Sequence, residues 1–139
     1  MSTAFSAMDI GRTGVGMASH WLDNVSHNLA NANTVTATDE EPFRALRSVV
    51  QPLENGPFAE GGSGVLTTGQ VREEGDPALT YDPDHPLADE DGMVAQPVME
   101  MSGQMVDLMV AQRHYQSNIR TIQSAKEAYE SALGLGRGQ

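Results

Sequence analysis

The two ends of the chain carry hydrophobic residues at helical spacing. In the N-terminal segment one series recurs every seven residues, and a second series of mostly smaller residues follows three positions later. These series are Met8, Val15, Leu22 and Leu29, and then Gly11, Ala18, Val25 and Ala32. In the C-terminal segment the spacing alternates between three and four, through Val98, Met101, Met105, Leu108, Gln112, Tyr115, Ile119, Ile122, Lys126, Tyr129 and Leu133. Both patterns predict an amphipathic helix with a coiled-coil-like seam.

The two predicted helices have similar lengths, so they can pair as a long antiparallel hairpin. We place the N-terminal helix at residues 1–36 and the C-terminal helix at 98–134, followed by a frayed, glycine-rich tail at 135–139. Each glycine in a helix interior is less favourable than alanine by about 1 kcal/mol, so the N-terminal helix is expected to depend on packing. The glycines concerned are Gly11, Gly14 and Gly16. The same stripe pattern also occurs in core helices of ordinary globular domains.

Residues 37–97 have a different character and predict a small β insert. Residues 43–51 and 65–72 combine β-branched residues, leucine and phenylalanine with arginine, and a turn-rich loop separates them. The stretch YDPDHPLADEDG then places two prolines among acidic residues, which indicates a stiff, extended connector into the C-terminal helix. Its marked positions are Tyr81, Asp82, Pro83, His85, Pro86 and Gly92. The predicted fold is therefore mainly α, with long terminal helices paired as an antiparallel coiled-coil-like hairpin and an irregular or β middle region.

The charge of the chain is concentrated in this middle region. The 139 residues carry a formal net charge of −11, and residues 39–91 hold −10 of it. Such a surface repels nucleic-acid phosphates and anionic lipids, whereas the near-neutral ends suit burial against protein. The absence of cysteine excludes disulfides and thiolate metal sites. No signal peptide or membrane-spanning segment is recognised in the sequence.

Candidate chemistry is weak throughout the sequence. His20 and His27 lie near one helix face with Asp23, but no metalloprotease, phosphate-loop or nucleophile motif accompanies them. The order of residues before Gly92 does not fit a calcium-binding loop, although several acids occur there: Asp82, Asp84, Asp89 and Asp91. We therefore expect no catalytic residue, no metal site and no cofactor. A cluster of methionines is instead typical of an adaptable partner-binding face; it comprises Met99, Met101, Met105 and Met109.

The stretch HNLANANT ends the N-terminal pattern with three asparagines, which favour helix caps and turns. Within it, NLANANT resembles the N-terminal motif of flagellar rod, hook and hook–filament junction proteins, through Asn28, Leu29, Asn31, Asn33 and Thr34. The stretches YDPDHPLADEDGMV and MVDLMVAQRHYQSNIRTIQSAKEAY resemble the corresponding regions of proximal rod proteins of the flagellar basal body. Together these stretches cover about half of the chain.

The resemblance implies a non-enzymatic structural subunit of the proximal rod, which crosses the periplasm. Its terminal helices would assemble a helical tube that transmits torque and encloses an export channel. The implied partners are copies of the chain, other rod proteins and the flagellar type III export apparatus, with no nucleic acid, small-molecule substrate or membrane insertion. Asn31 and Asn33 could cap the helix or contact a neighbouring subunit. The alternative function is a soluble helical adaptor that binds a single partner protein.

Overall fold

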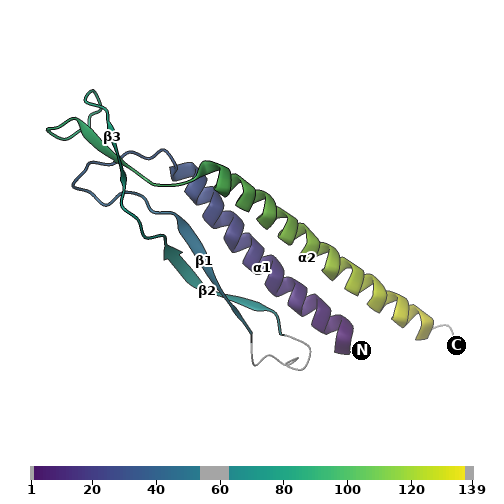
Figure 1. Ribbon diagram of the computed structural model, residues 1–139. Helices are drawn as coiled ribbons and strands as arrows, with labels where there is room; N and C mark the ends of the chain where they lie inside the picture. Colours follow the sequence, from purple (N-terminus) through teal and green to yellow (C-terminus); the bar gives the residue numbers. More distant parts are fainter. Residues whose placement is uncertain (1, 54–62, 137–139) are drawn as a thin grey trace.

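The computed structural model describes residues 2–53 and 63–136, and it has two long helices joined by two small β-hairpins (Figure 1). The elements, in chain order, are α1 Ser2–Asn31, β1 Leu46–Pro52, β2 Val65–Arg72, β3 Ala78–Tyr81, β4 Met93–Gln96 and α2 Met101–Gly136. β1 pairs with β2 and β3 pairs with β4, both antiparallel. The predicted fold class is confirmed, including the β character of residues 65–72.

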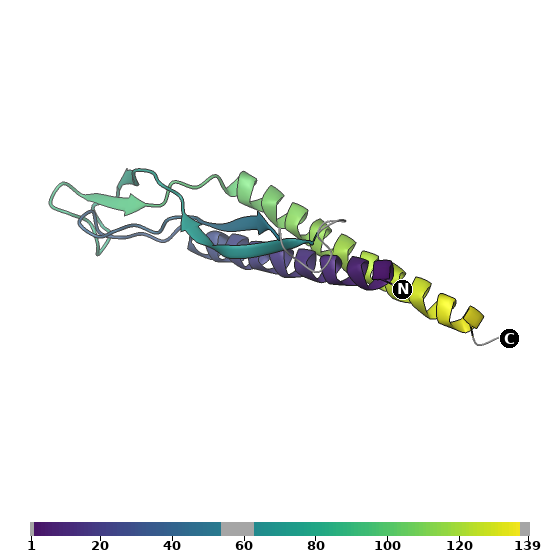
Figure 2. The same cartoon turned by 90° about the horizontal axis from the view of Figure 1, so that it is seen from below.

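The two helices lie side by side and run in opposite directions (Figures 1 and 2). At one end the rings of Phe5 and Tyr129 meet edge to face, with centroids 4.9 Å apart. At the other end the amide of Asn28 donates a hydrogen bond of 3.0 Å to Gln104. Contacts between the start of one helix and the end of the other, at both ends, establish the antiparallel pairing.

Small residues form the seam between the helices. Ala18 of α1 and Ala111 of α2 are each 0% exposed. A Cβ atom built on Gly11 would lie 2.8 Å from Cγ1 of Ile122, and one built on Gly14 would lie 2.6 Å from the side-chain oxygen of Asn118. A real Cβ atom does not sit that close to another heavy atom. The glycines that weaken α1 as an isolated helix therefore allow the close approach of α2.

The stripe predicted on the C-terminal helix is divided between two surfaces. Ile122 and Tyr129 contact α1. Nearer the start of α2, the seam also includes Ala111 and Asn118, which are not part of the predicted hydrophobic stripe. Other stripe members are exposed: Met101, Met105, Tyr115 and Leu133. The hydrophobic pattern did not include Ala111 and Asn118 because it counted large apolar side chains, whereas the close packing of these two helices also uses small ones.

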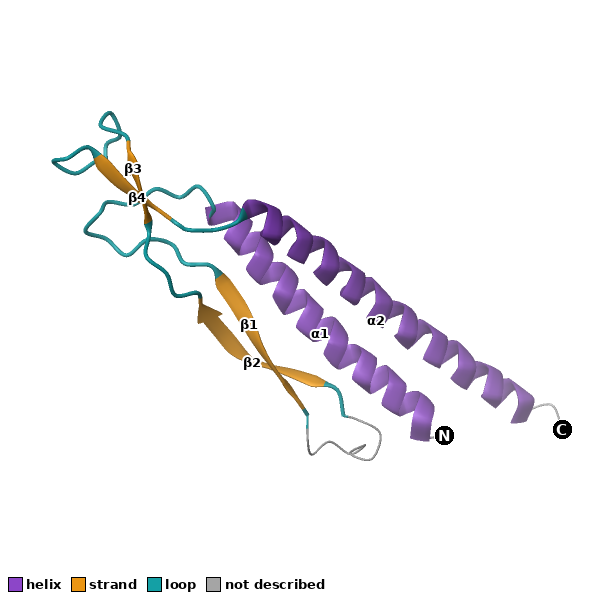
Figure 3. Cartoon of the chain, viewed as in Figure 1, coloured by secondary structure: helices purple, strands orange, loops and turns teal. Residues whose placement is uncertain are grey.

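The first hairpin packs along α1, so that α1 lies between the hairpin and α2 (Figure 3). Leu46 pairs with Arg72 at one end of the hairpin, and Pro52 pairs with Val65 at the other. The register shifts between Val49 and Val50, which marks a bulge. Bulges increase strand twist, and a twisted ribbon can follow the surface of a helix.

The second hairpin stands beyond the ends of the helices, and it corrects the prediction of an extended connector. Residues 82–92 form the loop between β3 and β4, since Asp82 N–H donates to the carbonyl of Gly92 at 2.9 Å. Gly92 adopts a φ of 73°, and a side chain there would press on Pro83 and Tyr81. The prolines thus shape a closed loop, and residues 97–100 lead into α2.

The helix bounds differ from those placed on the sequence. α1 ends at Asn31, where the side-chain amide donates to the carbonyl of His27 at 2.9 Å, so Asn31 satisfies a carbonyl of the last turn. Residues 32–36 lie outside the helix, and Thr36 instead forms a β-bridge with Ala95. α2 begins at Met101 rather than residue 98, after Pro97.

Candidate functional site

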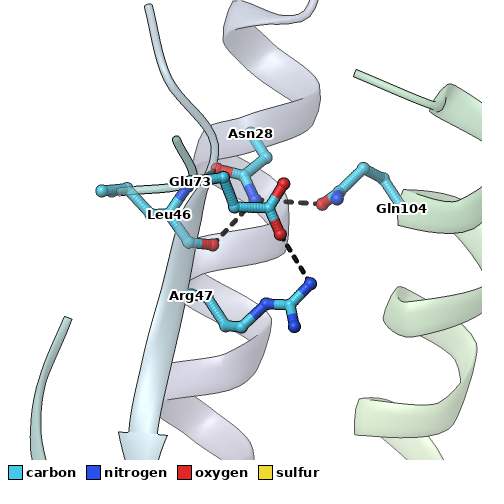
Figure 4. Close-up of polar contacts among 5 residues, drawn as sticks. All are labelled: Asn28, Leu46, Arg47, Glu73 and Gln104. Atoms are coloured by element: carbon cyan, nitrogen blue, oxygen red, sulfur yellow. Dashed lines mark hydrogen bonds and ion pairs between the residues drawn. The ribbon is translucent and has the colours of Figure 1, made fainter. Parts of the chain in front are cut away.

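A buried amide from the asparagine-rich motif joins three elements. Asn28 is 2% exposed, and its carbonyl oxygen accepts the backbone N–H of Leu46 at 2.7 Å. Its amide nitrogen donates to the carbonyl of Leu46 and to the side chain of Gln104, both at 3.0 Å. Figure 4 shows this arrangement, with the Arg47–Glu73 ion pair beside it. One side chain therefore fixes the start of β1 and the start of α2 on α1.

A second buried amide lies one helical turn earlier. Asn24 is also 2% exposed; it donates to the hydroxyl of Ser48 and accepts from the amide of Gln70, both at 2.6 Å. Ser48 and Gln70 are register partners on β1 and β2. The spacing of four residues places Asn24 and Asn28 on the same side of α1. Both strands of the first hairpin are thus tied to this side of the helix.

Thr13 anchors the far end of the same hairpin. Its hydroxyl accepts the backbone N–H of Val65 at 3.1 Å and donates to the carbonyl of Ile10 at 2.8 Å. Gly64 precedes this contact with a φ of 96°, and a Cβ atom there would collide with Thr13. The hairpin is therefore held on α1 by polar contacts along its length.

A groove opens between α1, β1 and the start of α2. Its volume is about 360 Å³. α1 contributes apolar side chains, which are Met17, Trp21 and Val25. The walls carry Leu46, Arg47, Ser48 and Val50 of β1, Glu73, and Gln104 and Asp107 of α2. The lining thus combines apolar side chains with polar ones, including the buried amide of Asn28. Concave surfaces of this mixed kind are typical of binding sites.

The outward side of α2 is a second surface of interest. Met101, Met105 and Met109, here called the methionine face, follow one another at intervals of four residues and are 37%, 54% and 52% exposed. Val98 and Val106 beside them are exposed as well. Side chains four apart share one face of a helix. Contiguous apolar surface of this kind marks an interaction site.

Other predicted positions have different places in the structure. On α1, Met8, Val15, Leu22 and Leu29 are half-buried, whereas Val25 is buried. On α2, Leu108, Ile119, Ile122 and Tyr129 are half-buried. In the asparagine-rich motif, Asn33 is exposed and makes no hydrogen bond to the described residues, and Thr34 donates to Asn31 at 3.3 Å. Of this motif, only Asn28 belongs to the cluster of buried polar contacts, which also comprises Asn24, Ser48, Gln70 and Gln104.

The residues predicted to form a connector lie in a loop around Asp89, one of the acids whose order does not fit a calcium-binding motif. The backbone N–H of Met93 donates to Asp89 at 2.8 Å and lowers the pKa of this carboxyl; the hydroxyl of Thr38 and the N–H of Asp91 act in the same direction. Asp89 thus organises the loop and links it to Thr38. Tyr81 and Asp82 are exposed, and His85 accepts the N–H of Leu87 at 3.2 Å.

The described residues offer no assembled catalytic or metal centre. No group of three or more His, Asp or Glu side chains among them is placed to hold a metal ion. Within residues 2–53 and 63–136, neither helix combines the length and apolarity that a membrane crossing requires.

Sequence reasoning missed Asn24, Gln70 and Gln104 as members of the cluster. An available signal was the spacing of four residues between Asn24 and Asn28, on a side of the helix that also includes Thr13. A polar stripe beside an apolar one is ambiguous, because it is equally typical of a solvated helix face.

Comparison with known proteins identifies the class of protein to which this architecture belongs. Residues 95–135 match the family model described as flagellar basal body rod FlgEFG protein C-terminal. This segment contains most of α2 and the residues leading into it.

Relatives over the whole chain define the particular family. The flagellar basal-body rod protein FlgC of Salmonella typhimurium is 35% identical over 129 residues, covering 93% of this chain and 95% of that protein. FlgC of Borreliella burgdorferi is 30% identical over 149 residues, covering 96% of this chain and 98% of that protein. FlgC of Aquifex aeolicus is 32% identical over 130 residues. The chain belongs to the FlgC family of flagellar basal-body rod proteins. It is a structural, non-enzymatic rod subunit of the flagellar basal body.

Proposed function

We propose that the chain polymerises through the outward surfaces of its paired terminal helices, with copies of itself and other rod proteins, into the helical tube of the proximal rod. The observation that carries this proposal is the exposed methionine face of α2. Methionine side chains adapt to different neighbours. A rod subunit that meets non-identical proteins needs such a surface.

The paired helices suit this mechanical role because they act as one rigid unit. Close packing through Gly11, Gly14, Ala18 and Ala111 leaves little space between them. Asn28 and Gln104 then link the helix pair to the hairpin. Torque applied to the helices would therefore reach the hairpins without a flexible joint at Asn28. A tube also demands a heterologous interface that does not close into a ring.

The proposal includes delivery by the flagellar type III export apparatus. Buried apolar residues among those described are small, namely Ala18, Val25, Ala45, Val94, Ala95 and Ala111. A core of alanine and valine contributes less hydrophobic stabilisation than one of leucine and phenylalanine. The subunit should accordingly unfold at low cost before export. Disabling the export apparatus should trap the chain in the cytoplasm.

The test of assembly is the double substitution Met105→Asp/Met109→Asp. Both side chains are more than half exposed, so the monomer should retain its helix content and thermal midpoint. Burying two new carboxylates between subunits would be strongly unfavourable, so rod growth, external hook protein and swimming should be lost. Normal swimming by this variant would contradict the proposal.

The matched control is Gln123→Asp. Gln123 is exposed and lies eighteen residues after Met105, which is a whole number of helical turns, so it shares the outward direction of the methionine face. It introduces the same side chain where the helix is already polar. This variant should swim, which separates loss of the apolar surface from a general effect of charge on α2.

A further inference from the structure

No described segment of the chain fills the groove between α1, β1 and α2. The end of α2 has the apolar, uncharged character that would suit this groove. α2 projects past the start of α1 (Figure 2). The ring contact of Tyr129 with Phe5 lies near this end, and the helix continues to Gly136. Leu133 is 45% exposed and Leu135 is 82% exposed, so the projection carries two uncovered leucines.

We propose that the projecting end of α2, residues 131–136, docks into this groove on a second copy of the chain. The inference rests on the proposed polymerisation and names a surface for it that is separate from the methionine face. The groove and the projection lie toward opposite ends of the helix pair, because the groove includes Gln104 and the projection follows Tyr129. A contact between them joins copies head to tail and leaves both outer ends free.

The charges of the chain favour this pairing over other contacts between copies. Residues 39–91 hold −10 of the net charge of −11, so contacts between the middle regions of two copies bring acidic surfaces together. Residues 131–136, SALGLG, contain no charged side chain, and the next charge in the sequence is that of Arg137. On the groove, Asp107 forms no ion pair with any described residue. The uncharged, apolar end of α2 thus meets a groove that offers apolar lining residues and an acid without an ion-pair partner among the described residues.

The size of the groove also agrees with this occupant. About 360 Å³ lies at the lower end of the range, roughly 300–1,000 Å³, over which pockets hold small ligands. It is suited to one or two leucine side chains rather than to a whole helix. Met17, Trp21 and Val25 provide the apolar contacts for them.

Two surface variants of the full-length chain test the head-to-tail geometry. Leu133→Ser/Leu135→Ser removes the projecting leucines, and Val50→Asp places a carboxylate in the groove. The wild-type chain should self-associate in sedimentation experiments, and each variant alone should lose this association. The dissociation constant should rise by at least about tenfold for each buried leucine that is removed.

Mixing the two variants is the decisive measurement. A chain with an intact groove and a chain with an intact projection can form one contact, so the mixture should form dimers and no larger species. Asp107→Arg is a second groove variant, which should also complement the leucine variant if Val50→Asp weakens the hairpin. Leu79→Ser, which removes an exposed leucine from the second hairpin, should behave as wild type.

Trp21 provides an independent signal because it is the only tryptophan and lines the groove. Its emission should shift to shorter wavelength, and iodide should quench it less, as wild-type dimers form. A wild-type chain that stays monomeric up to about 1 mM, a marginal affinity, overturns the inference. So does a mixture without dimers, or a groove that fills only when another rod protein is added. If Met105→Asp/Met109→Asp still abolishes swimming in those cases, the proposed function stands and only the groove assignment fails.

Discussion

The two neighbours of α1 are held to it by different chemistry. Toward α2 the helix presents glycine and alanine, and the contact depends on close approach of two backbones. Toward the first hairpin it presents Thr13, Asn24 and Asn28, and the contact depends on hydrogen bonds to strand backbone and side chains. Packing through small residues tolerates no added volume, whereas amide contacts tolerate no loss of a polar partner. Substitutions on these two adjacent sides of α1 should therefore destabilise the fold by different mechanisms: added volume on one side and loss of a hydrogen-bond partner on the other.

The largest effect is expected at Asn28, because its amide forms hydrogen bonds to both neighbours of α1, the first hairpin and α2. Replacement by leucine keeps the approximate volume but leaves both backbone groups of Leu46 and the side chain of Gln104 without this partner. Each buried group left unpaired costs about 1–3 kcal/mol, so the free energy of unfolding should fall by roughly 2–4 kcal/mol. Urea unfolding followed by circular dichroism measures the change.

Asn33→Leu is the matched control for this prediction. Asn33 belongs to the same motif but is exposed and makes no hydrogen bond to the rest of the described chain. Its replacement should change the free energy of unfolding by no more than about 0.5 kcal/mol. Equal effects of the two substitutions would mean that burial of the Asn28 amide contributes nothing specific.

The helix seam should respond to added volume instead. Gly11→Leu introduces a Cβ atom 2.8 Å from Ile122 Cγ1, together with a larger side chain in a closed space. Overpacking of this kind lowers the free energy of unfolding by about 1–3 kcal/mol. Thermal unfolding of Gly16→Leu provides the comparison, since no atom lies within 4 Å of a Cβ atom there. Gly16→Leu should be neutral or stabilising, because leucine has the higher helix propensity.

The sequence predicted the α2-facing side of α1 better than its hairpin-facing side, and the chemistry of the two sides explains this difference. Heptad spacing through Val25 and Ile122 was sufficient to place two long helices and pair them. It could not identify Ala111 and Asn118 as seam residues, because neither is large and apolar. It could not identify Asn24 either, since a buried amide and a solvated one look the same in a sequence.

The β region shows a different limit. The β-branched residues and leucine in residues 65–72 indicated a strand, and the structure has β2 there. β3 and β4 have four residues each, which is too short for a periodic signal. The prolines between them suggested an extended segment, but the left-handed conformation of Gly92 lets the chain turn back. The prolines lie in two tight turns instead, because the N–H of His85 donates to the carbonyl of Asp82 at 3.2 Å and the N–H of Ala88 donates to that of His85 at 3.0 Å. The role of Gly92 in closing this loop was not predicted.

A smaller effect is expected at Thr13, at the far end of the hairpin. Thr13→Val keeps the shape of the side chain but removes the acceptor for the N–H of Val65. The net contribution of one such hydrogen bond is about 0.5–1.5 kcal/mol. Amide hydrogen exchange at Val65 should accelerate, while exchange in the middle of α2 should change less. Thr13→Ser keeps the hydroxyl and should protect Val65 as the wild type does; failure of serine to do so would assign the effect to packing.

The smallest effect is expected at Asp89, which lies outside both contacts of α1. The N–H of Met93, the hydroxyl of Thr38 and the N–H of Asp91 lower the pKa of this carboxyl in the folded chain. The unfolded chain therefore binds a proton at higher pH than the folded chain does. Consequently the stabilisation by Asp89 is complete above the ordinary aspartate pKa of about 4, and it is lost as the pH falls through the lowered value.

Asp89→Asn removes this dependence, because the amide cannot ionise. Thermal unfolding of the wild type and the variant should differ most at neutral pH, and the difference should shrink below about pH 4. Because Asp89 is exposed, the difference should remain small. Asp84→Asn, in the same loop, changes a carboxyl that has no hydrogen-bond or ion-pair partner among the described residues, and it should leave the thermal midpoint close to that of the wild type. A difference between wild type and Asp89→Asn that is constant across this pH range would show that the Asp89 charge does not hold the loop, and that its side-chain geometry alone does.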